Sequence, residues 1–73
     1  MGFSEILQEL RKEQGLTHKE LAEAIQYSKA IIGFWESQKS EPKASAIIAL
    51  ADFFNVSTDY LLGRVDEAGK PLK

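Results

Sequence analysis

The sequence contains no cysteine, and His18 is its only histidine. Without cysteine the chain can form neither a disulfide framework nor a thiolate metal site, and one imidazole cannot hold a zinc ion by itself. The acidic residues follow the solvated faces of the expected helices, so no set of side chains resembles a catalytic centre. The sequence therefore predicts a protein that is not an enzyme. We expect no catalytic residues, no metal, no cofactor and no small-molecule ligand.

Long apolar segments are also lacking. No run approaches the roughly 18 residues that span a bilayer. Glu5 and Glu9 interrupt the N-terminal region, where a secretory signal needs an apolar core. These absences predict a chain that makes no membrane contact and acts in the cytoplasm. With 73 residues the chain allows one domain with one small core, for which good helix ends and tight packing are needed.

Charge of either sign is close to balance, with 9 basic and 11 acidic residues and a net charge of −2. This balance argues mildly against a nucleic-acid binder, although the distribution over one face matters more than the sum. Across residues 17–43 four lysines meet four glutamates. These are Lys19, Lys29, Lys39 and Lys43, and Glu20, Glu23, Glu36 and Glu41. Any basic face is thus modest, and we expect non-specific DNA affinity to be weak.

Apolar residues recur at helical spacing along most of the chain, and no segment alternates as a strand does. This spacing predicts helices over residues 4–14, 18–24, 29–37 and 44–54, and a short fifth helix between Ser57 and Gly63. The second helix is expected to bury Leu21, Ala22 and Ile25. The fold class is therefore all-α, a five-helix domain over residues 1–63. Residues 64–73 are expected to form a polar, flexible tail.

Residues 17–36 carry the clearest local pattern, two short helices with similar starts. Thr17 and Ser28 are hydroxyl N-caps, each with an apolar residue before it and another four positions after it. This hydrophobic staple fixes the angle at which the chain joins its helix, and Glu20 adds a capping box to Thr17. Two such helices joined by a turn of about three residues predict a helix-turn-helix, whose second helix commonly lies in the DNA major groove.

Several short motifs follow one another in a fixed order along the chain. They are Leu10-Arg11, Gly15-Leu16-Thr17, Glu20-Leu21-Ala22, Ser28, Ile32, Trp35-Glu36, Glu41-Pro42, Val56-Ser57 and Asp59-Tyr60-Leu61-Leu62-Gly63. In this order the sequence resembles the lambda-repressor-like helix-turn-helix family of Cro and XRE type, small five-helix DNA-binding domains of phage and bacterial repressors. The resemblance implies a helix-turn-helix at the second and third helices. It also implies an ion pair between Arg11 and Glu36 that joins the first helix to the third.

The resemblance further implies that the third helix lies in the major groove of double-stranded DNA. Base contacts are then expected from Lys29, Ala30, Gly33 and Phe34. Phosphate contacts, which position the protein, are expected from Thr17, His18, Ser28, Ser37 and Lys39. A histidine that faces a phosphate binds it more tightly as the pH falls, whereas the alternative for His18 is an exposed residue without a role in binding.

The expected recognition helix departs from the family because it is apolar. Base edges are donors and acceptors, yet Lys29 alone offers a long donor, while Ala30 and Phe34 can pack against thymine methyl groups. Ile31 is apolar where a small polar residue is usual. Either the helix reads DNA mainly by methyl contacts, or Ile31 and Phe34 form a patch that contacts another protein, or they are the edge of the core.

Two glutamines replace glycines that are usual in the family, Gln26 after the second helix and Gln38 after the third. A left-handed backbone at such a residue costs about 1 kcal/mol. If both positions adopt that conformation, this chain is a less stable version of the fold.

Two functions of different kinds follow from these residues. The first is a sequence-specific transcriptional regulator, a repressor of phage, mobile-element or bacterial type, which binds an operator as a homodimer. Two copies one helical turn apart would read a near-palindrome. By resemblance, Thr58, Tyr60 and the tail are the expected dimer contacts. The alternative is a protein-interaction module, antitoxin- or adaptor-like, that uses the apolar face of the third helix.

Overall fold

Five helices form in the described part of the chain, residues 2–66 and 68–70 of the computed structural model. They are α1 (Phe3–Glu13), α2 (His18–Ile25), α3 (Lys29–Glu36), α4 (Ala44–Phe54) and α5 (Thr58–Leu61). The predicted all-α fold is confirmed, and the first four helices match their predicted bounds to within one residue. None of the helices in the described residues is long and apolar enough to cross a membrane.

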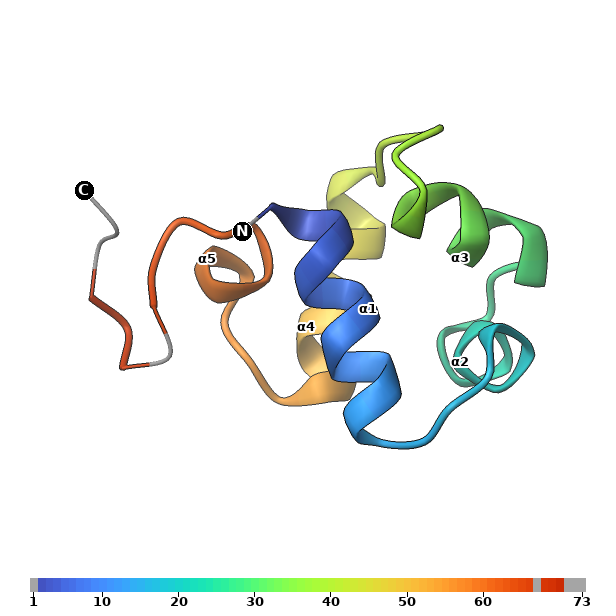
Figure 1. The fold of residues 1–73 in the computed structure, drawn as a ribbon, viewed down its shortest axis with the longest axis horizontal. Coiled ribbons are helices and arrows are strands. Elements are labelled where there is room, and N and C mark those ends of the chain that lie inside the picture. Colours follow the sequence, from blue (N-terminus) through green and yellow to red (C-terminus); the bar gives the residue numbers. More distant parts are fainter. Residues whose placement is uncertain (1, 67, 71–73) are drawn as a thin grey trace.

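The helices are arranged so that α2 and α3 lie at one end of the longest axis and α5 at the other, with α1 and α4 between them (Figure 1). α3 packs against both α1 and α2, whereas α5 packs against α1 and α4. The two helices of the predicted helix-turn-helix therefore form one end of the molecule, and α1 links that end to the rest.

One apolar core joins all five helices. Each helix contributes one completely buried side chain, and these are Leu7, Leu21, Ile32, Leu50 and Leu61. Ala22 of α2, the helix that packs against α3, is also buried. Ile25, which was expected in the core, is only partly buried because it is the last residue of α2.

Three of the five helices, α2, α3 and α5, begin on hydroxyl caps, and the sequence predicted those of α2 and α3. The side-chain oxygens of Thr17, Ser28 and Ser57 accept hydrogen bonds from backbone amides three residues later, at 3.1, 3.3 and 3.0 Å. The carboxylate of Glu20 in turn accepts from the amide of Thr17 at 2.8 Å, which completes the predicted capping box.

All five helices end in the same way, with one residue in the left-handed conformation. These residues are Gly15, Gln26, Gln38, Asn55 and Gly63, with φ between +58° and +77°. After each of them, the next amide donates to the carbonyl five residues earlier, at 2.8 to 3.1 Å. This arrangement satisfies carbonyls at the end of a helix and usually has glycine at the left-handed position. The left-handed backbone considered for Gln26 and Gln38 is confirmed.

The chain after α5 forms a turn around Asp66. Its carboxylate accepts hydrogen bonds from the amides of Ala68 and Lys70 at 3.0 and 2.9 Å, and its own amide donates to the carbonyl of Lys70 at 2.8 Å. The sequence predicted only a flexible polar tail here and gave no sign of this turn. The last part of that expected tail, residues 71–73, lies outside the described residues.

Candidate nucleic-acid interface

α3 has a buried face and an exposed face. Ile32 and Trp35 hold the buried face in the core. Positions four apart on a helix share a face, so residues 29 and 33 and residues 30 and 34 lie together on the opposite side. This exposed face carries the four residues expected to contact bases, Lys29, Ala30, Gly33 and Phe34. The largest apolar surface on it is Phe34, whose exposed fraction is 44%.

Ile31 does not belong to this exposed face. It is partly buried against the core and, with Tyr27 and Trp35, lines a hollow of about 360 Å³ that reaches the start of α4. Of the interpretations considered for Ile31, the edge of the core is therefore the one that the structure supports. Of the two residues of the expected protein-binding patch, only Phe34 therefore lies on the exposed face of α3.

The two helix starts at this end of the molecule present hydroxyl groups. Thr17 and Ser28 use oxygen lone pairs to cap their helices. Each hydroxyl hydrogen stays available to donate to a phosphate oxygen. Ser37 differs, because its hydroxyl donates to the carbonyl of Phe34 at 3.4 Å. Lys39 follows Gln38 in the loop and is exposed.

Arg11 and Glu36 form an ion pair between α1 and α3. Nε of Arg11 donates to Oε2 of Glu36 at 2.6 Å, and Nη2 donates to Oε1 at 3.0 Å. The exposed fractions of the two side chains are 12% and 5%, so the pair is largely shielded from water. Arg11 also donates from Nη1 to the carbonyl of Leu16 at 2.8 Å, which fixes the loop before α2.

The surroundings of Glu36 keep it ionised. Burial raises the pKa of Glu36. The hydrogen bonds from Arg11 and His18, together with the charges of both, lower it by more than burial raises it, so the pKa lies below the ordinary value of 4.5. The pKa of Arg11 is raised, chiefly by its hydrogen bond to Glu36 and against the effect of burial. Both members of the pair are therefore charged throughout the neutral range.

His18, which was expected to face a phosphate, lies against the end of α3. Its Nε2 is 3.1 Å from Oε1 of Glu36, and 35% of its side chain is exposed. Glu36 is 18 residues further along the chain, so the pattern of helices alone did not show this contact. The carboxylate of Glu36 thus joins three helices, with Arg11 from α1 and His18 from α2.

Ser4 is a further residue that holds α3 in place and that sequence reasoning missed. Its hydroxyl donates to the carbonyl of Trp35 at 2.6 Å. Phe3 packs edge-on against the Trp35 ring, with ring centroids 6.5 Å apart. A serine at the start of an amphipathic helix carries no signal of such a role, because only the packing of α1 against α3 brings the two groups together.

Two residues expected at a dimer contact lie at the far end of the molecule, on α5 (Figure 1). Thr58 is exposed, whereas Tyr60 is partly buried and packs against the core. A partner molecule could therefore reach only part of the Tyr60 side chain.

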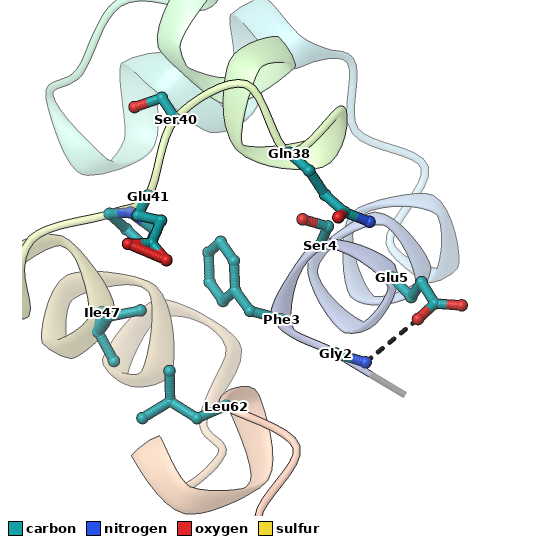
Figure 2. A pocket seen from close by; sticks show the side chains of 10 residues that line it. Gly2, Phe3, Ser4, Glu5, Gln38, Ser40, Glu41, Ile47 and Leu62 are labelled. Atoms are coloured by element: carbon teal, nitrogen blue, oxygen red, sulfur yellow. Dashed lines mark hydrogen bonds between the residues drawn. The ribbon is translucent and has the colours of Figure 1, made fainter.

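A hollow of about 460 Å³ lies away from the exposed face of α3, between the start of α1, the loop after α3 and the end of α5 (Figure 2). Phe3, Ile47 and Leu62 line it together with the loop residues Ser40 and Glu41. Among residues 2–66 and 68–70 there is no group of three or more histidine, aspartate or glutamate side chains that could hold a metal ion.

The exposed face of α3, the capped start of α2 and the tight turn between the two helices define a helix-turn-helix domain. The sequence profile of the helix-turn-helix family matches residues 7–61, and the chain belongs to this family.

Two curated relatives are transcriptional regulators. The HTH-type transcriptional activator BcrR of Enterococcus faecalis is 40% identical over 62 residues, which are 85% of this chain and 30% of BcrR. The HTH-type transcriptional regulator ImmR of Bacillus subtilis (strain 168) is 36% identical over 70 residues, 96% of this chain and 54% of ImmR. The chain therefore spans less than two thirds of the length of either relative.

Among solved structures, the P22 c2 repressor protein in complex with a synthetic operator has a similar fold. The TM-score is 0.80 and the sequence identity is 27%, and the match covers 85% of this chain and 94% of that one. The likeness extends over nearly all of the repressor chain.

Proposed function

We propose that this chain is the DNA-binding domain of a transcriptional regulator, that it recognises a specific site in double-stranded DNA, and that it performs no catalysis. The observation that carries the proposal is the exposed face of α3, which lies beside the capped helix starts at one end of the molecule (Figure 1). The regulatory roles of BcrR and ImmR and the operator complex of the P22 c2 repressor support it.

In this proposal α3 lies in the major groove. Lys29 donates to guanine, while Ala30 and Phe34 pack against thymine methyl groups and Gly33 allows a close backbone approach. Phosphates on either side are contacted by Thr17, His18, Ser28, Ser37 and Lys39. Hydroxyl hydrogens on Thr17 and Ser28 that are not used in capping suit this role.

We further propose that two copies bind a near-palindromic operator and repress transcription by occupying it. The position of Thr58 and Tyr60 on α5, away from α3, leaves the DNA-binding face free when two copies pair through that end. A cytoplasmic location beside DNA follows from this role. Because only part of Tyr60 is accessible, the contact depends more on Thr58 and the chain that follows α5.

Selection of binding sites from random DNA duplexes, followed by a salt series on the winning duplex, tests the proposal. We expect one sequence pattern to be enriched. The logarithm of the affinity should fall linearly with the logarithm of the salt concentration, with a slope of about −0.9 per neutralised phosphate. Absence of enrichment together with a flat salt response would overturn the proposal and favour a protein-binding role.

Two lysine substitutions distinguish the base contacts, which recognise the sequence, from the phosphate contacts, which position the protein on DNA. Lys29→Ala should weaken the preference for one base pair by about 1–3 kcal/mol and leave the other positions of the site unchanged. Lys39→Ala should weaken binding to all sequences alike and reduce the salt slope by about 1. If neither variant differs from the parent chain, the assigned face of α3 is wrong.

A further inference from the structure

His18 and Gly33 meet where α2 packs against α3. A Cβ atom at position 33 would lie 3.6 Å from Nδ1 and 3.7 Å from Cε1 of His18, so this edge of the imidazole ring lies over the bare backbone of the glycine. The ring thereby stands beside the exposed face of α3 at the one position of that face without a side chain. His18 is placed to supply a contact that position 33 cannot make.

The opposite nitrogen of the ring is held by Glu36. Nε2 of His18 lies 3.1 Å from Oε1 of Glu36. An ionised carboxylate can only accept, so Nε2 carries the hydrogen in this contact. Glu36 is ionised at neutral pH because Arg11 and His18 lower its pKa by more than burial raises it. The orientation of the ring is therefore fixed by a group that does not titrate near neutrality.

Among residues 2–66 and 68–70, Nδ1 of His18 has no hydrogen-bond partner, and it is open to a ligand. Within residues 2–66 and 68–70, every side-chain nitrogen or oxygen that is sealed from solvent has a partner. Nδ1 has none, so it belongs to the accessible 35% of the side chain. With Nε2 engaged inside the molecule, Nδ1 is the atom that a ligand on the α3 side would meet.

The charge of the ring decides which ligand Nδ1 can bind. In the neutral ring with its hydrogen on Nε2, Nδ1 is an acceptor and repels a phosphate oxygen. The imidazolium form donates from both nitrogens and can therefore bridge a carboxylate and a phosphate. Histidine changes between these forms in the physiological pH range.

We propose that His18, held by Glu36 and placed over Gly33, donates from Nδ1 to a phosphate oxygen of duplex DNA only as the imidazolium, so that DNA binding takes up one proton. This inference rests on the proposed DNA-binding function. Since the bound state holds more protons than the free state, affinity rises as the pH falls, by at most about tenfold per pH unit for one proton.

Charged groups lie near the ring on all three helices of this region. The carboxylate of Glu36 from α3 faces Nε2, and Arg11 from α1 binds the same carboxylate. On α2 itself Lys19 and Glu20 are exposed, and the Glu20 carboxylate is engaged with the amide of Thr17. A phosphate bound at Nδ1 would add an anion beside the ring, and an anion favours the imidazolium.

The test measures the affinity for a duplex selected by the parent chain, at constant salt, from about pH 6 to pH 8, the range over which histidine titrates. We expect the parent chain to bind more tightly towards pH 6. His18→Gln keeps an amide donor without titration, so its affinity should not depend on pH. Lys19→Gln, on the neighbouring exposed residue, is the matched control and should lower affinity equally at each pH.

NMR of the imidazole provides a second measurement that needs no variant. His18 is the only histidine in the sequence, so its ring signals are unambiguous. The midpoint of the ring titration should move to higher pH when the duplex is added. Binding without pH dependence and with an unchanged midpoint would overturn this inference while leaving the proposed function intact, as would a pH dependence that persists in His18→Gln. Absence of binding to any duplex would instead overturn the proposed function and this inference with it.

Discussion

Each helix is followed by a residue in the left-handed conformation, but the type of residue differs between the helix-turn-helix (α2 and α3) and the other helices (α1, α4 and α5). The left-handed residues that follow α1 and α5 are Gly15 and Gly63, and the one that follows α4 is Asn55, residues that adopt this conformation readily. The left-handed residues that follow α2 and α3 are Gln26 and Gln38, with φ of +63° and +65°. A side chain of this kind costs about 1–2 kcal/mol in that conformation. The part of the molecule that presents the candidate site thus has the less favourable local sequence.

Tertiary contacts compensate for this difference. Within α3, Gly33 lowers the helix propensity by about a further 1 kcal/mol. The last turn of the helix, however, is held by the ion pair of Glu36 with Arg11 and by the hydrogen bond from Ser4 to the carbonyl of Trp35. Both contacts come from α1. The last turn of α3, next to Gln38, is therefore held by α1, whereas the residues that follow α1, α4 and α5 are favourable by themselves.

The largest effect is expected from removing the charge of Glu36. Glu36→Gln leaves the shielded Arg11 guanidinium without its counter-charge, and the free energy of unfolding should fall by about 3 kcal/mol. Urea denaturation followed by circular dichroism measures this value. Glu23→Gln, on an exposed residue of α2, is the control and should change stability by less than about 0.5 kcal/mol. Equal values for the two variants would show that the ion pair contributes little.

Acid should weaken the same contact. The pKa of Glu36 is lower in the folded chain than its ordinary value of 4.5, so its contribution to stability is fully present above pH 4.5. That contribution is lost as the pH falls through the lowered pKa. Urea denaturation at neutral and at acidic pH should therefore show a smaller loss of stability in Glu36→Gln than in the parent chain. Parallel losses in the two proteins would contradict this expectation.

Exchanging glycine and glutamine at the left-handed positions after the helices should reverse the difference in local stability between the two regions. Gln26→Gly and Gln38→Gly should each raise the free energy of unfolding by about 1 kcal/mol, because glycine relieves the left-handed strain. Gly15→Gln should lower it by a similar amount, since position 15 has φ of +67° and open space for a side chain. Thermal and urea unfolding of the three variants measure these changes. Asn55→Gly is the control, and its change should be the smallest.

Gly33→Ala should give the smallest gain, up to about 1 kcal/mol, through better helix propensity. The new Cβ atom would meet only the His18 ring, at 3.6 and 3.7 Å, which is ordinary van der Waals contact. Urea unfolding measures the gain. A loss of stability in this variant would mean that the new Cβ atom displaces the His18 ring, contrary to the van der Waals distances of the contact.

The comparison also shows which features the sequence could predict. Caps, staples and apolar spacing are local, so the helices and their starts were predicted to within about one residue, and the resemblance supplied the pairing of Arg11 with Glu36. The contact of His18 with Glu36 and that of Ser4 with Trp35 depend on how α1, α2 and α3 pack, which no local pattern contains. Ile31 lies between the two faces of α3, and its partial burial involves the start of α4. The sequence of α3 alone therefore could not predict it.

The separation of faces on α3 has a consequence for how new binding specificities could arise. The contacts that fasten this helix to the rest of the molecule come from the side chains of Ile31, Ile32, Trp35 and Glu36 and from the carbonyl of Trp35. The side chains at positions 29, 30 and 34 take no part in them. Evolution or a protein engineer can therefore exchange these three residues while the domain keeps its fold, so the same scaffold can be directed to another target by changing one helix face.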